Sequence, residues 1–518
     1  MKTTLKIFLI LLTFNFVSFA QLKYPEAHKD NIVDNYFGTK VPAPYQWMEN
    51  INSKAVRTWI NEEKKITENY FSKIPFRNKL KKRFTQLWNY ERYSAPRKEG
   101  KYYFFSKNNG LQEQSVVYYQ KGLNGKAKVF LDPNTLSKNN TVTLMGMSFS
   151  KDNKYCSYSI SRGGSDWREF YVMNVATRKK LKDHLQWIKF SGMSWYKHGF
   201  YYSRYPSAKG ENKLKIKVEN QKLYYHKLGE PQSKDILVYQ DTEHPQRGFD
   251  GYVTDDQKYL IVNIWEGASN NNLLAFQNLQ TKSKIKMIFN KLEAQYSFID
   301  DNNGKFLILT NFNTPNFKVI LIDPLHPQKK NWKTIIPESK NVINNVSSVG
   351  GKLIVSYLKD ANTKVTVFTL NGKKLYDVKL PGIGTASGFI GHKNDKEVFY
   401  TFTTFTVPPT IYRYNIAKNK SVLFRKSDLK FDINNYTTKE VFYKSKDGTR
   451  VPLFIVYKKG LKLNGNNPTM LFHCWKTVEF MQWLVCAAAV NTVKNGIKPV
   501  CWETNKMFLT ISFGRQNI

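Results

Sequence analysis

The sequence predicts an all-β fold, a seven-bladed β-propeller, from two observations. From about residue 100 apolar and polar residues alternate, which is the period of a β-strand. One type of strand start also recurs seven times, 44 to 59 residues apart: KYYFFS at Lys101, KYCSYSIS at Lys154, GFYYSRY at Gly199, KYLIVNIW at Lys258, KFLILTNF at Lys305, KLIVSYL at Lys352 and KEVFYTF at Lys396. A repeat of this length holds about four short strands, which is typical of a propeller blade.

Turn residues separate the strands within each repeat. In KYCSYSISRGGSDWREFYVMNV, the residues Gly163, Gly164, Ser165 and Asp166 provide the turn chemistry of a hairpin. The competing fold, a β-sandwich, needs far fewer residues and does not repeat at this period. We therefore expect seven blades that close around a central channel and end near Lys430.

The segments on either side of the repeats have other patterns. From Asn52 to about Glu91 apolar residues recur at helical spacing, and Pro75 divides the segment into two amphipathic helices, the first capped by Asn52 or Ser53. After Lys430, FYKSKDGTRVPLFIVYKKG predicts two strands joined at Asp447-Gly448, and NNPTMLF begins another strand. A second domain therefore begins after the propeller.

Charge and composition limit the partners. The chain has 518 residues, 41% of them hydrophobic, and a formal net charge of +40. The lysines are spread over turns and solvent faces along the whole chain, so we expect no nucleic-acid partner. No metal or other cofactor is expected, because the histidines show no ligand spacing and are assigned to the surface or to blade turns; they are His28, His184, His198, His226, His244, His326, His392 and His473.

The first twenty residues resemble an export signal. Lys2 and Lys6 precede the apolar run IFLILLTFNF, and Ser18-Phe19-Ala20 places small residues at the expected cleavage site. This run is too short for a comfortable membrane span, and no later segment approaches one, so no membrane partner is expected. We predict a signal peptide at residues 1–20 and an exported protein, with the periplasm as its destination.

Several segments, in order, resemble the prolyl oligopeptidase family of serine peptidases: DNYFGTKVPAPYQWMEN, SRGGSDW, QKLYYHKLG, NTPNFKVILID, FYTFTTFTVPPTIYRY and SKDGTRVPLFIVYKKG. The resemblance implies a seven-bladed propeller joined to an α/β-hydrolase domain that is built from both chain ends. It implies these domains: residues 21–91, the N-terminal helical segment of the hydrolase domain; 92–430, the propeller; and 431–472, the start of the α/β-hydrolase domain, which is incomplete in this sequence.

Residues 473–518 do not match the family in the reading frame as given. When each codon from Cys474 onward is read from its third base, the genetic code permits LENGGIYAVA, one non-matching residue, and LRGGGEYGEEWHKAG, a family string. It then permits NKQNVFDDFI with one mismatch, followed by AAEY. Our hypothesis is a short deletion and frame change near residues 472 to 474, so that 473–518 is an out-of-frame tail. The alternative is a divergent C-terminus.

The resemblance implies a serine-type prolyl endopeptidase that hydrolyses short peptides on the C-terminal side of proline. Its Ser, Asp and His are expected to follow in that chain order, and the sequence contains no G-x-S-x-G nucleophile turn. We therefore expect no catalytic residue in this chain and no activity as written. For Ser148, in GMSFS, we expect a strand position rather than a nucleophile.

The expected partners follow from the same resemblance. Short proline-containing peptides are the expected ligands, and Phe190, in KFSGMSW, is the one substrate-binding residue that the family's propeller supplies, with blade core as the alternative for its side chain. The alternative function is a non-catalytic propeller that binds peptides or proteins. Because helices and strands made to pack on a hydrolase domain would expose apolar faces without one, we expect a monomer or an aggregate.

Overall fold

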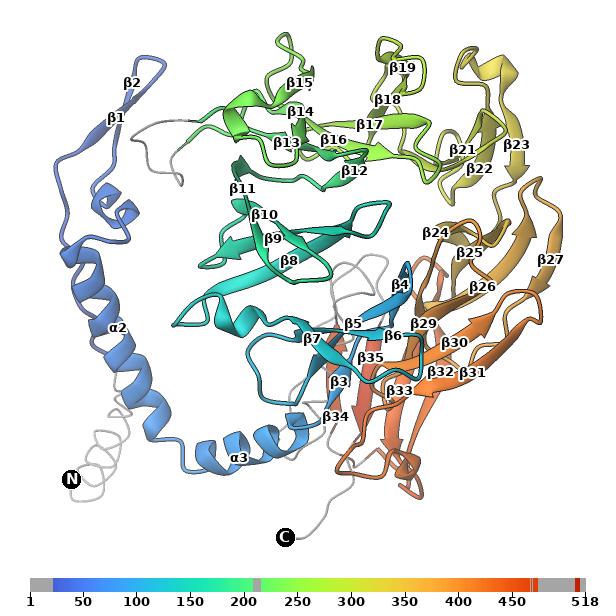
Figure 1. The fold of residues 1–518 in the computed structure, drawn as a ribbon. Coiled ribbons are helices and arrows are strands. Elements are labelled where there is room, and N and C mark those ends of the chain that lie inside the picture. The colour runs from blue at the N-terminus through green and yellow to red at the C-terminus, as the bar shows by residue number, and fades with distance from the viewer. Residues whose placement is uncertain (1–21, 208–215, 466, 468, 474–507, 513–518) are drawn as a thin grey trace, which may run out of the picture. The chain divides into compact units, whose positions relative to one another are not determined.

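A computed structural model of the chain describes residues 22–207, 216–465, 467, 469–473 and 508–512 (Figure 1). The predicted signal peptide and most of the predicted out-of-frame tail lie outside the described residues. The chain divides into two compact units, Met1–Gln86 and Leu87–Ile518.

The first unit contains a hairpin and helices. The hairpin strands are β1 (Val33–Tyr36) and β2 (Thr39–Pro42), a 3-10 turn follows at Gln46–Glu49, and the helices are α2 (Lys54–Ser72) and α3 (Arg77–Trp88), whose last residues pass into the second unit. The Ser53 hydroxyl caps α2 by accepting a hydrogen bond from the Val56 N–H at 3.2 Å, which satisfies a donor that the first turn leaves unpaired. Both predicted helices, and Ser53 as the cap, are confirmed.

Seven sheets of the second unit, counted among the described residues, form the blades of a propeller (Figure 1). Blade 1 is β3 (Arg92–Tyr93), β4 (Arg97–Glu99), β5 (Tyr102–Asn108), β6 (Val116–Lys121) and β7 (Lys128–Leu131); blade 2 is β8 (Val142–Phe149), β9 (Tyr155–Arg162), β10 (Arg168–Asn174) and β11 (Lys180–Ile188); blade 3 is β12 (Ser194–Tyr196), β13 (Gly199–Arg204), β14 (Lys222–Lys227) and β15 (Ile236–Tyr239).

The other four blades follow the same plan. Blade 4 is β16 (Arg247–Val253), β17 (Tyr259–Glu266), β18 (Asn272–Asn278) and β19 (Lys286–Phe289); blade 5 is β20 (Tyr296–Asn302), β21 (Lys305–Thr310), β22 (Lys318–Ile322) and β23 (Lys333–Ile336); blade 6 is β24 (Val342–Val349), β25 (Lys352–Lys359), β26 (Asn362–Thr369) and β27 (Lys374–Asp377); blade 7 is β28 (Thr385–Ile390), β29 (Glu397–Thr403), β30 (Thr410–Asn415) and β31 (Lys420–Arg425). The predicted seven-bladed fold is confirmed.

Each recurring strand start in the sequence is the second strand of a blade. These strands are β5, β9, β13, β17, β21, β25 and β29, and they pair on both sides with antiparallel neighbours. Two flanking strands and two neighbouring blades bury them, which explains their apolar character: in β17, Leu260, Val262 and Ile264 are at most 1% exposed. The residues 163–166 form the predicted turn between β9 and β10, with Gly163 and Gly164 at φ +61° and +73°, a conformation that favours glycine. Ser148 lies in β8, as expected.

The core consists of hydrophobic clusters that join consecutive blades rather than filling single ones. Six clusters join blades 1 and 2, 2 and 3, 3 and 4, 4 and 5, 5 and 6, and 6 and 7. The cluster between blades 4 and 5, for example, packs Phe276 of β18 against Phe306 of β21, with ring centroids 5.4 Å apart. Each blade is therefore stabilised mainly by its neighbours.

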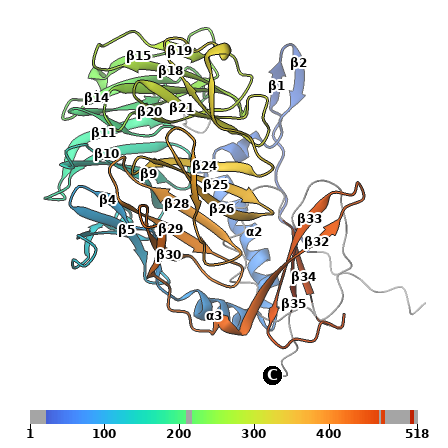
Figure 2. The same cartoon turned by 90° about the vertical axis from the view of Figure 1, so that its right-hand side faces the viewer.

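A further sheet follows blade 7 (Figure 2). Its strands are β32 (Tyr436–Lys444), β33 (Arg450–Lys458), β34 (Thr469–His473) and β35 (Phe508–Ser512), in the order β32-β33-β35-β34, with β33 and β35 parallel. The first three were predicted, including the turn at Asp447, whose carboxylate accepts a hydrogen bond from the Thr449 N–H at 2.9 Å. The strand β35 belongs to the predicted out-of-frame tail, which stays a prediction. Other short 3-10 turns lie at Pro133–Thr135, Gln232–Lys234, Lys329–Asn331 and Ile433–Asn435.

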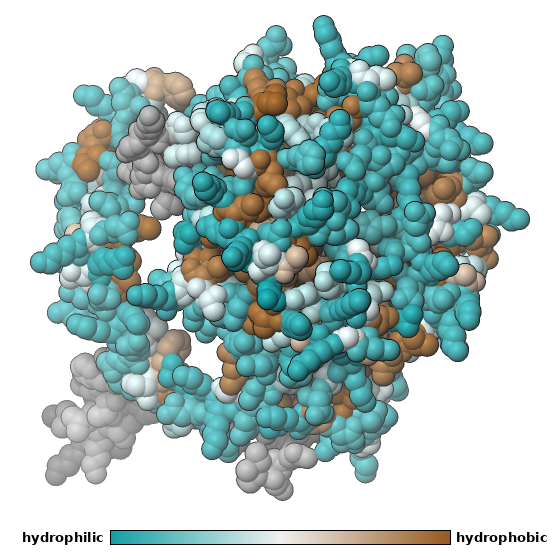
Figure 3. Space-filling model, viewed as in Figure 1, coloured by the Kyte–Doolittle hydropathy of each residue, from teal (hydrophilic) through white to brown (hydrophobic). Residues whose placement is uncertain are grey.

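The visible surface is dominated by polar residues. The face in Figure 3 is mostly hydrophilic, with apolar side chains in separate patches. Among the helices that the structure describes, none has the length and apolar character needed to cross a membrane.

Candidate functional site

A cavity of about 770 Å³ lies among the first strands of the seven blades. All of its lining belongs to the second unit: Arg97, Glu99 and Gly100 from blade 1; 145–151, Asn153, Ser159 and Arg168 from blade 2; 191–195 from blade 3; 250–253 and Asp255 from blade 4; Ile299 and Asp300 from blade 5; Ser348 from blade 6; and 390–393 from blade 7. The first strand of each blade forms one edge of its sheet, and these seven edges face one another around the channel. The volume is in the range of small-ligand sites.

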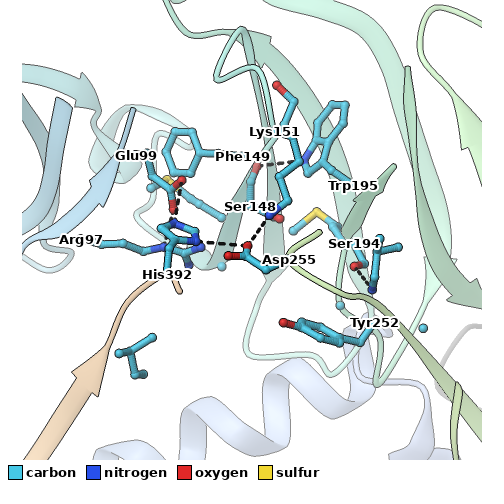
Figure 4. Close-up of a pocket in the computed structure, with 18 of the residues that line it drawn as sticks. Arg97, Glu99, Ser148, Phe149, Lys151, Ser194, Trp195, Tyr252, Asp255 and His392 are labelled. Atoms are coloured by element: carbon cyan, nitrogen blue, oxygen red, sulfur yellow. Dashed lines mark hydrogen bonds and ion pairs between the residues drawn. The ribbon is translucent and has the colours of Figure 1, made fainter. Parts of the chain in front are cut away.

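Charged residues gather where the first strands end (Figure 4). His392 contacts two carboxylates, with its Nδ1 3.2 Å from Asp255 Oδ1 and its Nε2 3.9 Å from Glu99 Oε2. Each carboxylate has a second cation, since Lys151 pairs with Asp255 and Arg97 Nε lies 2.5 Å from Glu99 Oε1. This group, the channel ring, links blades 1, 2, 4 and 7.

The pKa directions in the channel ring follow from these contacts. The hydrogen bond with His392, supported by Lys151, lowers the pKa of the Asp255 carboxyl well below its usual range, although burial acts in the opposite direction. The same hydrogen bond raises the pKa of His392 against the effect of burial. The ring is therefore a set of compensated charges, suited to holding blades together and to contacting a polar ligand.

A second ion cluster connects blade 5 to blade 7. The Lys393 ammonium lies 2.9 Å from both Asp300 Oδ1 and Asp301 Oδ1. Ser348 donates a hydrogen bond to Asp300 Oδ2 at 2.6 Å. Burial lowers the pKa of Lys393, but the bonds with Asp301 and Asp300 outweigh it and raise that pKa.

Apolar side chains line the same cavity as these ion pairs. Met145, Tyr252 and Ile390 are 45%, 51% and 72% exposed, which is unusual for large apolar side chains of inner strands. Met147, Met193 and Ile299 line the same space. We call these six side chains the apolar wall. Such a wall gives a ligand apolar area to bury.

Phe190 lies outside the cavity lining, in the connection between β11 and β12. It is 48% exposed, so the interpretation of this side chain as blade core is wrong. Its φ of +55° is uncommon for an aromatic residue. The next two residues, Ser191 and Gly192, line the cavity just before β12 begins. Phe190 as a substrate-binding residue stays a prediction.

The sequence contained a signal for the channel ring that our sequence reasoning missed. Lys151 and Asp255 of the channel ring, and Lys393 of the second ion cluster, each stand three residues before a recurring strand start, at Lys154, Lys258 and Lys396. In blades 2, 4 and 7 the turn before the second strand contributes residues to the cavity lining, so the charged residues of these turns are brought together.

One of the histidine assignments is wrong. His226 of β14 is fully buried and lies between two carboxylates, with Nδ1 2.7 Å from Asp235 Oδ1 and Nε2 3.0 Å from Asp183 Oδ1. These bonds overcome the opposing effect of burial and raise the pKa of His226 to about 9. The physical reason for the error is topology, because Asp183 lies 43 residues away along the chain, in the neighbouring blade. His244 and His326 are exposed, as expected.

The described residues do not group three His, Cys, Asp or Glu side chains in a way that would hold a metal ion. Cys156 is buried and free, and burial raises its pKa, so it is unreactive. The channel combines the apolar wall with charged side chains at defined positions, and this combination is suited to binding a ligand.

Comparison with known proteins gives one consistent result. The family described as "Prolyl oligopeptidase, N-terminal beta-propeller domain" matches residues 24–427. The prolyl endopeptidase of Elizabethkingia meningoseptica is 41% identical over 452 residues, which is 87% of this chain and 64% of that protein. The prolyl endopeptidase of Dictyostelium discoideum is 30% identical over 525 residues, 87% of this chain and 69% of that protein.

Solved structures agree. A structure from a study of two prolyl endopeptidases has a TM-score of 0.77 and 32% identity, covering 86% of this chain and 66% of that one. Prolyl oligopeptidase B from Galerina marginata, bound to a 25mer macrocyclization substrate, has a TM-score of 0.75 and 29% identity, covering 85% and 66%. The chain thus spans about two thirds of the length of the proteins that it resembles.

Proposed function

The chain belongs to the prolyl oligopeptidase family, and we propose that it is the propeller-bearing part of a serine-type prolyl endopeptidase that hydrolyses short peptides on the C-terminal side of proline. The observation that carries this proposal is the match to the family's propeller over residues 24–427. The identity with the Elizabethkingia prolyl endopeptidase supports the peptidase activity.

The cavity supports a peptide as the ligand. It combines the exposed apolar wall with paired charges at the end of the first strands. A peptide offers both apolar side chains and polar backbone groups to such a surface. In this proposal Phe190, directly before the cavity-lining residues Ser191 and Gly192, contacts the substrate.

We further propose that residues 1–518 as given do not hydrolyse peptides. The support is the absence of a G-x-S-x-G turn from the sequence, together with the family string LRGGGEYGEEWHKAG that the shifted frame permits after Cys474. The alternative, a propeller that only binds, is not favoured, since the sheet formed by β32, β33, β34 and β35 continues beyond the blades. Export, with removal of residues 1–20, is part of the same proposal.

The test begins with sequencing the gene from the codon for Asn467 through the first stop codon in the shifted frame. The chain as given and the frame-restored chain are then assayed on a chromogenic peptide with proline before the scissile bond. A peptide with alanine at that position is the control. We expect cleavage only by the restored chain and only after proline.

Two results would contradict the proposals. Cleavage by the chain as given would show that it is active as written. A restored chain that cleaves both peptides equally, or neither, would exclude a prolyl endopeptidase. Sequencing alone decides the frame, because a continuous frame with other wobble bases would leave a divergent C-terminus.

A further inference from the structure

The acidic side chains that line the cavity differ in their pairing. Four acids line it, namely Glu99, Asp250, Asp255 and Asp300. Three of them have basic partners: Glu99 pairs with Arg97, Asp255 with Lys151 and His392, and Asp300 with Lys393. Asp250 forms no salt bridge with any residue that the structure describes. It is therefore the one acid of this lining without a countercharge.

Asp250 is fixed toward the cavity by its strand and by one hydrogen bond. Its neighbours Phe249 and Gly251 are buried in the blade, so the alternation of β16 turns Asp250 to the channel side with Tyr252. Its Oδ1 accepts a hydrogen bond from the Gly192 N–H at 3.0 Å. Burial raises the pKa of Asp250, and this single bond offsets the effect only in part.

The surroundings of Asp250 suit a cation that arrives with a peptide. Two residues of the apolar wall lie close by in sequence and line the same cavity: Met193 follows Gly192 directly, and Tyr252 stands two residues after Asp250. Arg168, at the start of β10, also lines the cavity. It forms no salt bridge with Asp250 or with any other acid that the structure describes. Asp250 is half-buried, so part of the water around its carboxylate is already removed in the folded protein, and an external cation can form a charge-assisted hydrogen bond with it.

We propose that Asp250 is a subsite for a positively charged group of the bound peptide, either an N-terminal ammonium or the side chain of lysine or arginine. The inference rests on the proposed function, in that the channel takes a peptide, but it concerns charge and not proline. It implies a preference for basic over neutral and acidic peptides at this position.

The test measures binding of short peptides to the full chain captured on a sensor surface. One peptide contains proline and a free N-terminus, the second is its N-acetyl form, and the third is acetylated but carries one lysine. A fourth peptide replaces that lysine by glutamate. We expect the first or the third peptide to bind about tenfold or more tightly than the second, and the fourth to bind weakest. The comparison of the first with the third tells an ammonium terminus from a side chain.

The variant Asp250→Asn keeps the shape of the side chain and removes its charge. We expect this variant to bind all four peptides equally, within about twofold. The control is Asp428→Asn, which removes one exposed acid outside the cavity and should leave the preference unchanged. Equal binding of the charged and neutral peptides to the unmodified chain would overturn the proposal, as would a preference that Asp250→Asn retains.

A fifth peptide, with proline replaced by alanine, separates this inference from the proposed function. Suppose the fifth peptide binds as tightly as its proline counterpart, while the charged peptides still bind more tightly than the neutral one. The cation subsite then holds, and proline recognition by this part of the protein fails. If proline matters and charge does not, the inference fails alone. The peptide series needs no variant, so it decides the question even if Asp250→Asn does not fold.

Discussion

Six junctions of the propeller differ from the seventh in what fills them. Between blades 4 and 5, Phe276, Phe306 and Ile308 are at most 3% exposed and pack in one cluster. Between blades 7 and 1, the Arg425 guanidinium lies over the rings of Tyr93 and Phe105, 4.2 and 4.7 Å from their centroids. Tyr103 contacts Phe399 there at 6.2 Å, and Lys98 lies 3.8 Å from Asp395. We call this last junction the seam.

The difference shows at which junction the propeller is most easily opened. Every blade uses strands that are consecutive in sequence, so no strand from the end of the propeller completes blade 1. The other six junctions join blades that the chain itself connects. At the seam side chains hold the two blades, and burial lowers the pKa of the Arg425 guanidinium because it disfavours the charged form. We expect the seam to be the junction of lowest local stability.

The largest expected effect compares one aromatic ring at each kind of junction. Phe306→Ala removes a fully buried ring from the cluster between blades 4 and 5 and should lower the free energy of unfolding by about 3–5 kcal/mol. Tyr103→Ala at the seam, where the ring is partly exposed and contacts Phe399 of blade 7 at 6.2 Å, should cost less than half as much. Urea unfolding measures both. Equal losses would contradict the distinction between the seam and the other junctions.

Particular residues show how much of the fold and of the site the sequence predicts. The recurring strand starts, for example at Lys154 and Lys258, predict the second strand of each blade and therefore the seven blades. They are recognisable because burial of a strand on both faces gives it an apolar sequence pattern. The position of Ser53 as a helix cap is local and was predictable. The pairing of His226 with Asp183, and the unpaired state of Asp250, depend on contacts between strands far apart in sequence, which no local pattern encodes.

A second large effect concerns the junction of blades 2 and 3, which contains a buried charge. His226→Leu leaves Asp183 and Asp235 buried without a cation and should cost about 3–5 kcal/mol of unfolding free energy. The triple variant that adds Asp183→Asn and Asp235→Asn should recover a large part of this loss, since no ionised group then stays buried. Urea unfolding of both variants checks the prediction. A triple variant that is less stable than the single one would show that the loss comes from packing.

The same histidine gives a pH dependence whose sign can be worked out. The folded pKa of His226, about 9, lies above the ordinary value of 6.5, so its contribution is complete below about pH 6.5 and is lost as the pH rises through about 9. The loss should be roughly 3 kcal/mol, because one pKa unit corresponds to about 1.4 kcal/mol. Unfolding curves from pH 6 to 10 measure it, with the triple variant as the control that should lack this part of the pH dependence. A curve equally steep in both proteins would assign it to other groups.

The smallest effect is expected from the ion pair of the seam. Lys98 is about half exposed and Asp395 is mostly buried, so water and salt screen the pair from one side only. Lys98→Met keeps the aliphatic stem and removes the charge, and it should lower the free energy of unfolding by less than about 1 kcal/mol, with most of the loss gone in 1 M salt. Lys64→Met, which removes the exposed i,i+4 pair with Glu68 in α2, is the matched control and should have no more effect. A loss of several kcal/mol for Lys98→Met alone would mean that this ion pair is needed to close the propeller. The seam would then be as stable as the apolar junctions.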